Sequence, residues 1–406
     1  MIAILKKPTF LLFFLGNIIS LIGFGFNMIA ISWLVLAETS SEYTLGKIIA
    51  SATIPGLFIS LFTGYIIDKT NRKWLMVFLD IFRVIVILLF LLSLNYFDFT
   101  ILLLYPVVFL IGIGNSLFWS TSQAFTQEIV SESEYYNANK LLSASFQIGS
   151  ILGASIGGFV VHFYSPYVAL WINILAYLVS GILISLAPFK NSIKSSSNSN
   201  IIKSWMKGFI FLRQRFDIAM LSFTTILSDV AIWGSLSVLT ISISIQIFDM
   251  GTLGYGILDG FYGLGAFISV LIVGYLTSNW SRSLVLRGCY LFGFLSLLLS
   301  SIMPNILFAA LFFFLLGINI NSSRIITRTI IMENVDNKIM GRVQTVLGIY
   351  SRLMVVLSSL VTGFIIENYT IQLALFFTCM HYLVAFVGIT AVGIIWNKSN
   401  KYLFSN

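Results

Sequence analysis

The sequence predicts an all-α membrane protein in which twelve transmembrane helices form two pseudo-symmetric six-helix bundles. Of its 406 residues, 58% are hydrophobic and only 9% are Asp, Glu, Lys or Arg, whereas about 25% of an ordinary soluble domain is charged. Apolar runs long enough to cross a hydrocarbon core of about 30 Å recur along the chain. Short segments of the first half also recur in the second.

The predicted transmembrane spans begin shortly after Lys6 and Lys7. The first apolar run is too long for a signal peptide, and no small-residue cleavage site ends it. The twelve spans are 10–37, 45–67, 74–95, 101–125, 141–164, 167–188, 218–248, 253–277, 284–302, 305–327, 345–367 and 370–396.

The distribution of charge predicts that both termini are cytoplasmic. With this orientation the inside loops are rich in bases, while the outside loops carry mainly acids, as the positive-inside rule requires. The net charge of +8 therefore indicates membrane topology rather than binding to nucleic acid. We expect a multi-pass protein of the cell (inner) membrane. The outside acids are Glu38, Glu42, Asp98, Asp249 and Glu367.

A polar segment divides the chain into domains 1–189 and 218–406, with a cytoplasmic linker at 190–217. The linker begins with KNSIKSSSNSN and continues as IIKSWMKGFIFLRQR. Helical spacing places Trp205, Phe209 and Leu212 on one face, so we expect this amphipathic stretch to lie on the cytoplasmic leaflet. The alternative is a plain linker.

Two sequence repeats relate the halves. LIGIGNS at Leu110 matches LLGININ at Leu315, and GGFVVHFY at Gly157 matches TGFIIENY at Thr362, both at an offset of 205 residues. Since each half contains an even number of helices, this is a parallel repeat, which is typical of transporters whose two bundles enclose a site near the midplane.

The loop between the second and third spans reads GYIIDKTNRK. It resembles the loop signature of the major facilitator superfamily, although Asn71 stands where that family usually has Gly. The resemblance implies the major facilitator fold and transport by alternating access, with this loop as a conformational latch. A basic loop with an unrelated Asp is the alternative. The latch residues would be Gly64, Asp68, Lys69, Arg72 and Lys73.

The fifth span carries glycines in the segment GSILGASIGG. It resembles the glycine motif of the family's antiporters, but Ala154 replaces their proline. Small residues at this spacing also serve for close packing of helices in lipid, so both interpretations stay open. The four glycines are Gly149, Gly153, Gly157 and Gly158.

Asp80 and Arg83 in the third span are three residues apart and can form a charge pair on one helix face. We interpret them as part of a cytoplasmic charge network rather than a substrate site. The segment IIDKTNRKWLMVFLDIFRV resembles the macrolide-efflux and siderophore-export branch of the drug:proton antiporters.

Two acids lie within the predicted spans of the second half, and acids at membrane depth are candidates for function. Asp229 shares a helix face with Trp233, and Asp259 lies between Tyr255 and Tyr262. We expect either acid to couple transport to protons, Asp229 first because no base close in sequence would pair with it. A structural acid hydrogen-bonded within the bundle, or an acid at the outer mouth, is the alternative.

Other polar residues of the spans receive weaker interpretations. Asn17 and Asn27, with Trp233, Tyr255 and Tyr262, are candidates to line the cavity, although Asn17 and Asn27 could equally serve helix packing. Arg324 and Arg328 are expected near the cytoplasmic end of the tenth span, without a substrate role. His162 and His381 are expected to make satisfied polar contacts.

These observations together predict a secondary active transporter, not an enzyme, that exports a small amphipathic compound such as a drug, an antibiotic or a siderophore. Because the sequence has no phosphate-binding Gly-Lys loop, pumping would draw on an ion gradient or on the substrate's own gradient. Proton antiport is the expected driving force. Alternatives are an uptake symporter, a lysolipid flippase or, more remotely, a non-transporting membrane sensor. We expect a monomer in the lipid bilayer, with no cofactor and no metal site.

The topology can be tested by labelling single cysteines in intact cells. Cysteines at Ser40 and Asn368 should react with a membrane-impermeant maleimide, whereas those at Ser196 and Asn400 should react only after permeabilisation. Labelling at Ser196 from outside would contradict the predicted orientation.

Overall fold

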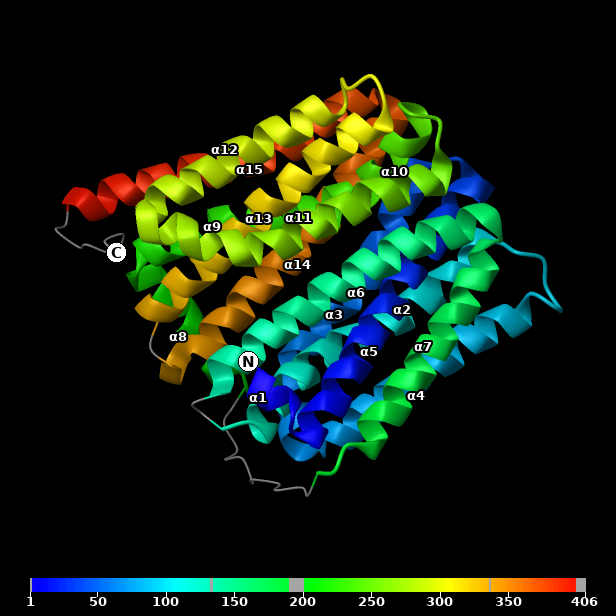
Figure 1. The fold of residues 1–406 in the computed structure, drawn as a ribbon, viewed down its shortest axis with the longest axis horizontal. Coiled ribbons are helices and arrows are strands. Elements are labelled where there is room, and N and C mark those ends of the chain that lie inside the picture. Colours follow the sequence, from blue (N-terminus) through cyan, green and yellow to red (C-terminus); the bar gives the residue numbers. More distant parts are fainter. Residues whose placement is uncertain (1, 132–133, 190–200, 336, 399–406) are drawn as a thin grey trace. The chain divides into compact units, whose positions relative to one another are not determined.

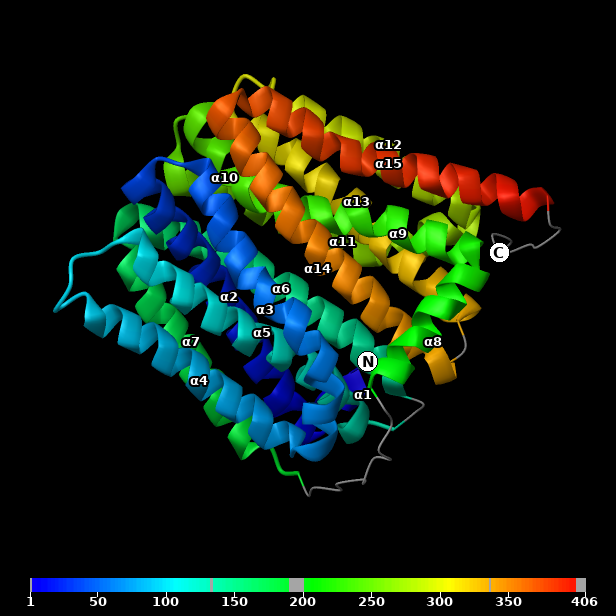
Figure 2. The same cartoon turned by 180° about the vertical axis from the view of Figure 1, so that it is seen from behind.

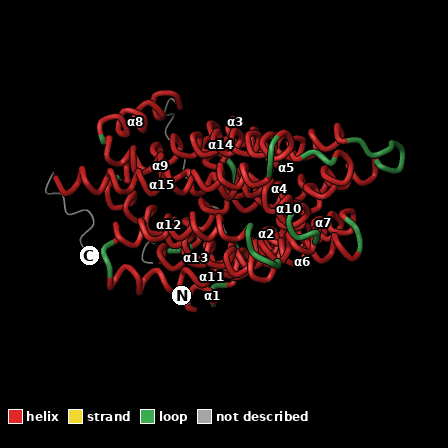
Figure 3. The backbone as a smooth tube through the Cα atoms, turned by 90° about the horizontal axis from the view of Figure 1, so that it is seen from above, coloured by secondary structure: helices red, strands yellow, loops and turns green. Residues whose placement is uncertain are grey.

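The computed structural model describes residues 2–131, 134–189, 201–335 and 337–398, and within these ranges the chain forms helices joined by short loops (Figures 1 and 3). The first half contains α1 (Ile2–Leu5), α2 (Pro8–Thr39), α3 (Glu42–Lys69), α4 (Arg72–Ser93), α5 (Ile101–Ile129), α6 (Tyr135–Phe163) and α7 (Pro166–Leu186). The second contains α8 (Ile201–Gln214), α9 (Phe216–Val230), the π-helix η2 (Ala231–Leu236), α10 (Ser237–Gln246), α11 (Gly251–Asn279), α12 (Arg282–Ser300), α13 (Ile306–Asn334), α14 (Asn337–Asn368) and α15 (Ile371–Lys398).

Among the described residues, 11 helical segments are long and apolar enough to cross a membrane, and α9, η2 and α10 together make one of them. The second predicted span falls on α3, whose 28 residues extend about 42 Å at 1.5 Å per residue. Each of the twelve predicted spans therefore has its own helix.

Several helices begin at a side chain that caps them. The Asn71 carboxamide accepts a hydrogen bond from the Trp74 amide at 3.3 Å at the start of α4. The Asn305 carboxamide accepts from two amides of α13, at 3.1 and 3.2 Å. Such caps satisfy amide groups that have no partner within the first helical turn, which allows the loops to be short.

The chain divides into two compact units. Unit 1 comprises residues 1–41, 51–197 and 251–256, and unit 2 comprises residues 42–50, 198–250 and 257–406. The predicted domains 1–189, 190–217 and 218–406 stay a prediction, but one feature of the units was not anticipated. The first turns of α3 group with unit 2, and the first turns of α11 group with unit 1.

In unit 1, α2 packs against α6 and α7, and α4 packs against α5 and α7. Figures 1 and 2 show α4 and α7 side by side from both directions. Aromatic side chains fill one end of this unit: the rings of Phe13 and Phe125 meet edge to face with centroids 5.3 Å apart, and both are fully buried.

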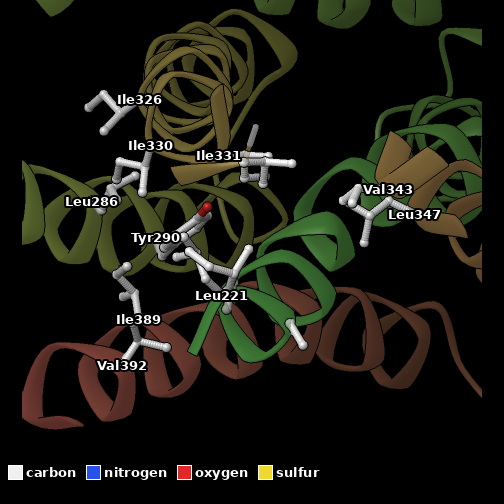
Figure 4. Packing of buried hydrophobic residues seen from close by; sticks show 14 of the residues in the cluster. Leu221, Leu286, Tyr290, Ile326, Ile330, Ile331, Val343, Leu347, Ile389 and Val392 are labelled. Atoms are coloured by element: carbon white, nitrogen blue, oxygen red, sulfur yellow. The ribbon is translucent and has the colours of Figure 1, made fainter. Parts of the chain in front are cut away.

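The core of unit 2 consists of aliphatic side chains around Tyr290 (Figure 4). Leu221 of α9, Ile330 of α13 and Ile389 of α15 converge on this ring and are fully buried. Helices α9, α12, α13 and α15 are thus joined by one apolar cluster, which fixes their rotations.

Glycines at equivalent positions of the two halves let a helix approach its neighbour closely. A side chain at Gly112 of α5 would collide with the carbonyl of Ala52 in α3, and one at Gly317 of α13 would collide with the carbonyl of Tyr262 in α11. These are the glycines of the first sequence repeat, so the repeat preserves a helix contact.

The linker helix α8 lies against α14, since a side chain at Gly208 would meet the backbone of Arg342. Leu212 is 3% exposed within the core of unit 2, whereas Phe209 is 60% exposed. The expectation that both share one lipid-facing side is wrong, because unit 2 covers the side that carries Leu212. The Trp205 side chain lies outside the described residues.

An exposed ion pair joins the start of α2 to the start of α6. Glu134 accepts a hydrogen bond from Lys7 at 2.6 Å and from the amide and hydroxyl of Ser131 at 3.0 and 2.8 Å. These donors, the Lys7 ammonium first, lower the pKa of the Glu134 carboxyl to about 2.

This ion pair should give the stability of the protein a pH dependence. Because the folded-state pKa of Glu134 is below its ordinary value, the contribution is present near neutral pH and lost as the pH falls towards about 2. Glu134→Gln should therefore lower the melting temperature at neutral pH, with a difference from wild type that shrinks in acid. Lys7→Met should give the same profile. A difference that does not depend on pH would contradict this assignment.

Candidate functional site

The bases of the predicted latch loop contact helices of unit 1. Arg72 donates to the carbonyl of Ala124 at 3.0 Å and pairs with Glu128 at 3.3 Å, both in α5. Lys73 donates to the carbonyl of Ala187 at 2.7 Å, at the carboxyl end of α7, where the helix dipole favours a cation.

The remaining residues of the predicted latch are Gly64, Asp68 and Lys69. Lys69 donates to the hydroxyl of Tyr65 in its own helix, at 2.7 Å. The Asp68 side chain and the surroundings of Gly64 lie outside the described residues, so the latch itself stays a prediction.

The charge pair of α4 lies in the interior of unit 1. Asp80 and Arg83 are 0% and 1% exposed and form an ion pair. The Ser180 hydroxyl donates to Asp80 at 2.8 Å, and Arg83 donates to the Asn115 carboxamide at 2.8 Å. The Arg83 guanidinium also lies 4.0 Å from the centroid of the Tyr177 ring.

This location corrects the interpretation of Asp80 and Arg83 as part of a cytoplasmic charge network. Their partners come from the buried faces of α5 and α7, while the loop bases Arg72 and Lys73 bond elsewhere. The reason is the rotation of α4, which turns residues 76, 80, 83 and 87 towards the core. With Ser20 of α2, which bonds to both side chains, the pair joins four helices of one unit.

The two asparagines of α2 are both buried, at 5% exposure. Asn17 donates to Ser145 of α6 at 2.8 Å and accepts from Ser122 of α5 at 3.2 Å. These contacts support the alternative that Asn17 serves helix packing. Asn27 has a buried side-chain oxygen for which no described residue supplies a hydrogen bond.

The glycines of α6 form a seam with two other helices of unit 1. A side chain at Gly153 would lie 2.9 Å from the Cα of Gly25 in α2, and one at Gly157 would lie 2.8 Å from Ile29. Gly149 lies against Leu21 of the same helix. Gly158 instead faces Gly256 in the first turns of α11. The seam accounts for all four glycines by packing, and a transport role for them stays a prediction.

In unit 2, Asp229 of α9 forms an ion pair with Arg324 of α13. Two guanidinium nitrogens, Nε and Nη2, lie 2.8 and 2.7 Å from one carboxylate oxygen. The side chains are 27% and 14% exposed. Tyr262 of α11 lies close enough to interact with both charges.

Two sequence-based expectations are therefore wrong. Asp229 is not an unpaired acid, and Arg324 is not a base that reaches the cytoplasmic surface. The tenth span was predicted to end at residue 327, but α13 continues to Asn334, which leaves Arg324 about ten residues from its end. Nothing in the local sequence of Asp229 could have identified a partner 95 residues away.

Asp259 of α11 differs from Asp80 and Asp229 in its contacts. It is partly exposed, and within the part of the chain that the structure describes no hydrogen bond or ion pair reaches it. Tyr255 and Tyr262 lie on the same face of α11, four residues before and three after. Tyr262 is 9% exposed and Tyr255 is partly exposed.

Trp233 lies in η2, one turn after Asp229, and is partly exposed. Together, Asp229, Arg324, Tyr262 and Asp259 place two acids, one base and an aromatic hydroxyl in the interior of unit 2. No group of three or more metal-binding side chains occurs among the described residues. This arrangement can hold a cation or exchange a proton, but offers no nucleophile with an adjacent base.

The sequence model of the Major Facilitator Superfamily matches residues 13–359. The chain belongs to this superfamily. It is therefore a membrane transporter rather than an enzyme.

Similar transporters occur in Bacillus. The chain is 22% identical to the uncharacterized MFS-type transporter YvqJ of Bacillus subtilis (strain 168), over 88% of this chain and 86% of that protein. It is 25% identical to the proposed bacilysin exporter BacE of Bacillus subtilis, over 77% of this chain and 78% of that protein.

Solved structures support the fold. The nucleoside transporter NupG superposes with a TM-score of 0.77 at 12% identity, covering 95% of this chain and 99% of that chain. The POT family transporter PepTSo superposes with a TM-score of 0.75 at 9% identity, covering 97% and 99%. The predicted major facilitator fold is thereby confirmed, whereas the macrolide-efflux and siderophore-export branch is not established.

The buried charge pair of unit 1 should be important for stability. Arg83→Met leaves Asp80 as an unpaired buried charge, which should cost about 3–5 kcal/mol in the free energy of unfolding. The matched control is Arg282→Met, which removes an exposed pair with Glu333 and should cost only about 0–1 kcal/mol. Thermal unfolding in detergent would measure both. Equal losses for the two variants would contradict a structural role of Asp80 and Arg83.

Proposed function

We propose that this protein is a secondary active transporter that exports a small amphipathic compound, with protons moving in the opposite direction. The observation that carries the proposal is Asp259, a carboxylate within the bundle of unit 2 that no described residue pairs. An ionised carboxylate in such a place is costly unless a proton or a cation neutralises it.

The flanking tyrosine rings would let this carboxylate bind an organic cation as well as a proton. Tyr255 and Tyr262 flank Asp259 at helical spacing along α11, and the faces of aromatic rings attract organic cations. A cationic amphipathic compound and a proton would then compete for one carboxylate, which is the simplest basis for exchange between them.

Asp229 is a weaker candidate than the sequence suggested, because Arg324 already neutralises it. A paired carboxylate has less reason to bind a proton than an unpaired one. We therefore propose Asp259 as the proton-responsive residue and Asp229 as a fixed member of an ion pair.

Export rather than uptake is favoured by the relative named as a proposed bacilysin exporter. The solved structures include a nucleoside transporter and a POT family transporter, and at their low identity they support the fold alone. Drugs, antibiotics and siderophores stay within the proposed substrate range, and uptake symport and lysolipid flipping are the alternatives.

The loop Gly64–Lys73 is proposed to act as a latch between transport states. Arg72 and Lys73 bond to α5 and α7, and Asp68 is proposed to make a contact that exists in only one of the states. Such a state-dependent contact shifts the populations of the two states without altering the cavity.

The proposal can be tested in proteoliposomes with a panel of labelled antibiotics, siderophores and lysolipids. A pH difference of one unit supplies about 1.4 kcal/mol per proton, enough for about a tenfold gradient of substrate. Wild-type protein should build such a gradient, and a protonophore should abolish it. Asp259→Asn should lose this accumulation while still exchanging substrate down its own gradient.

Asp229→Asn is the matched control. It leaves Arg324 unpaired, so it should lower the amount of folded protein and affect uphill and downhill movement equally. Proton-driven accumulation by Asp259→Asn would refute the role of Asp259. Movement of the panel compounds in the direction of the proton gradient would favour uptake symport, and lysolipid movement alone would favour a flippase.

A further inference from the structure

The seventh span is interrupted at its centre by η2, a π-helix with the sequence AIWGSL. Such segments are rare and occur frequently at functional sites. A π-helix disturbs the regular pattern of backbone hydrogen bonds, and the Ser237 hydroxyl donates to the carbonyls of Trp233 and Gly234, at 3.1 and 2.6 Å. The chain thus supplies its own donor to carbonyls of the irregular turn.

Helix α14 packs closely against η2. A side chain at Gly234 would lie 2.8 Å from the Cβ of Ser358 and 3.0 Å from the carbonyl of Val355, so only glycine permits this approach. The next residue, Ser235, forms a hydrogen bond with the Ser358 hydroxyl at 2.6 Å and accepts one from Thr362 at 2.9 Å.

The chain of hydrogen bonds continues to α15. The Ser358 hydroxyl lies 3.2 Å from Nε2 of His381, and Nδ1 of that ring lies 3.1 Å from the carbonyl of Phe377. Ser235, Ser358, Thr362 and His381 are all buried, at 0%, 3%, 0% and 7% exposure. Buried polar groups of this kind are costly if any one of them loses its partner.

With a neutral His381 ring, the direction of each bond in this chain follows from its partners. The Phe377 carbonyl can only accept, so Nδ1 carries a proton. We take the His381 ring as neutral, in which case Nε2 is an acceptor. Ser358 must then donate to His381, Ser235 must donate to Ser358, and Thr362 donates to Ser235. His381 is the terminal acceptor that orders the other three hydroxyls.

We propose that His381 is a positioning residue for the transport site, acting through Ser358 and Ser235 to hold η2 and so to fix Trp233 beside Asp229. This inference rests on the proposed function only where its test measures the KM for export. The position of Trp233 is then set by hydrogen-bonded side chains of α14 and α15.

The test compares His381→Phe, which keeps the ring volume but removes the acceptor, with Ser358→Ala and with the double variant. Each single variant should raise the KM for export about two- to tenfold, the range that one intramolecular hydrogen bond supports, with a smaller change in kcat per folded molecule. The double variant should be no worse than the more impaired single variant, because both changes break the same chain.

Two controls separate positioning from loss of structure. His381→Gln retains an acceptor near the position of Nε2 and should restore most of the wild-type KM. His162→Phe removes the other histidine, which is exposed and contacts the ring of Phe163, and should have no effect. A purely structural role would lower the amount of folded transporter and leave KM unchanged.

A second readout does not depend on transport. In a Trp233→Cys background, the rate of labelling by a water-soluble maleimide should change more than twofold with His381→Phe or Ser358→Ala, but not with His162→Phe. The native Cys289 and Cys379 are 4% and 0% exposed and should contribute little. If no panel compound is exported, the proposed function fails, whereas this labelling still decides the role of His381.

The inference would be overturned if both single variants left the labelling rate and the KM unchanged. It would also be overturned if the change in KM of the double variant equalled the product of the two single changes. If His381→Phe does not insert into the membrane, Ser358→Ala alone must change the labelling for the inference to stand.

Discussion

The neutralisation of charge inside the helix bundles is the constraint on which the rest of the structure depends. A carboxylate or guanidinium in a medium of low dielectric is stable only when a partner compensates for its lost hydration. Unit 1 solves this with Asp80 and Arg83, supported by hydroxyl and carboxamide groups from three other helices. Unit 2 solves it with Asp229 and Arg324, on two helices far apart in sequence. Asp259 stands apart because no described residue compensates it.

The fold was predictable because the bilayer imposes one length scale on every span. A helix must present about 20 apolar residues to cross the hydrocarbon core, so a simple search for apolar runs locates all the spanning helices. The repeats were equally informative, since Gly112 and Gly317 each allow close contact with the helix two elements earlier. Where two helix backbones must approach closely, glycine is required, and its recurrence at equivalent positions can be recognised in the sequence.

The candidate site was less predictable, because it depends on which faces of distant helices meet. Asp80 and Arg83 were recognised as a pair from their spacing, but their burial depends on the rotation of α4. The pairing of Arg324 was missed because its partner Asp229 lies on another helix, 95 residues away. The π-helix and its link to His381 left no sequence signal at all, since Ser235, the pair Ser358 and Thr362, and His381 lie on three separate helices far apart in sequence.

The division of α3 between the two units has a mechanical consequence. Residues 42–50 of this helix group with unit 2 and the residues from Ser51 onwards with unit 1, so the boundary between the units falls inside one continuous helix, whose stiffness matters at this level. Pro55 lies one turn beyond the division, and it has no amide hydrogen to donate to the Ser51 carbonyl. The helix is therefore more easily flexed at this level than elsewhere along its length. In α11, the equivalent junction falls at Gly256 and Ile257, where glycine lowers the resistance to bending for a different reason: it gives the backbone more freedom.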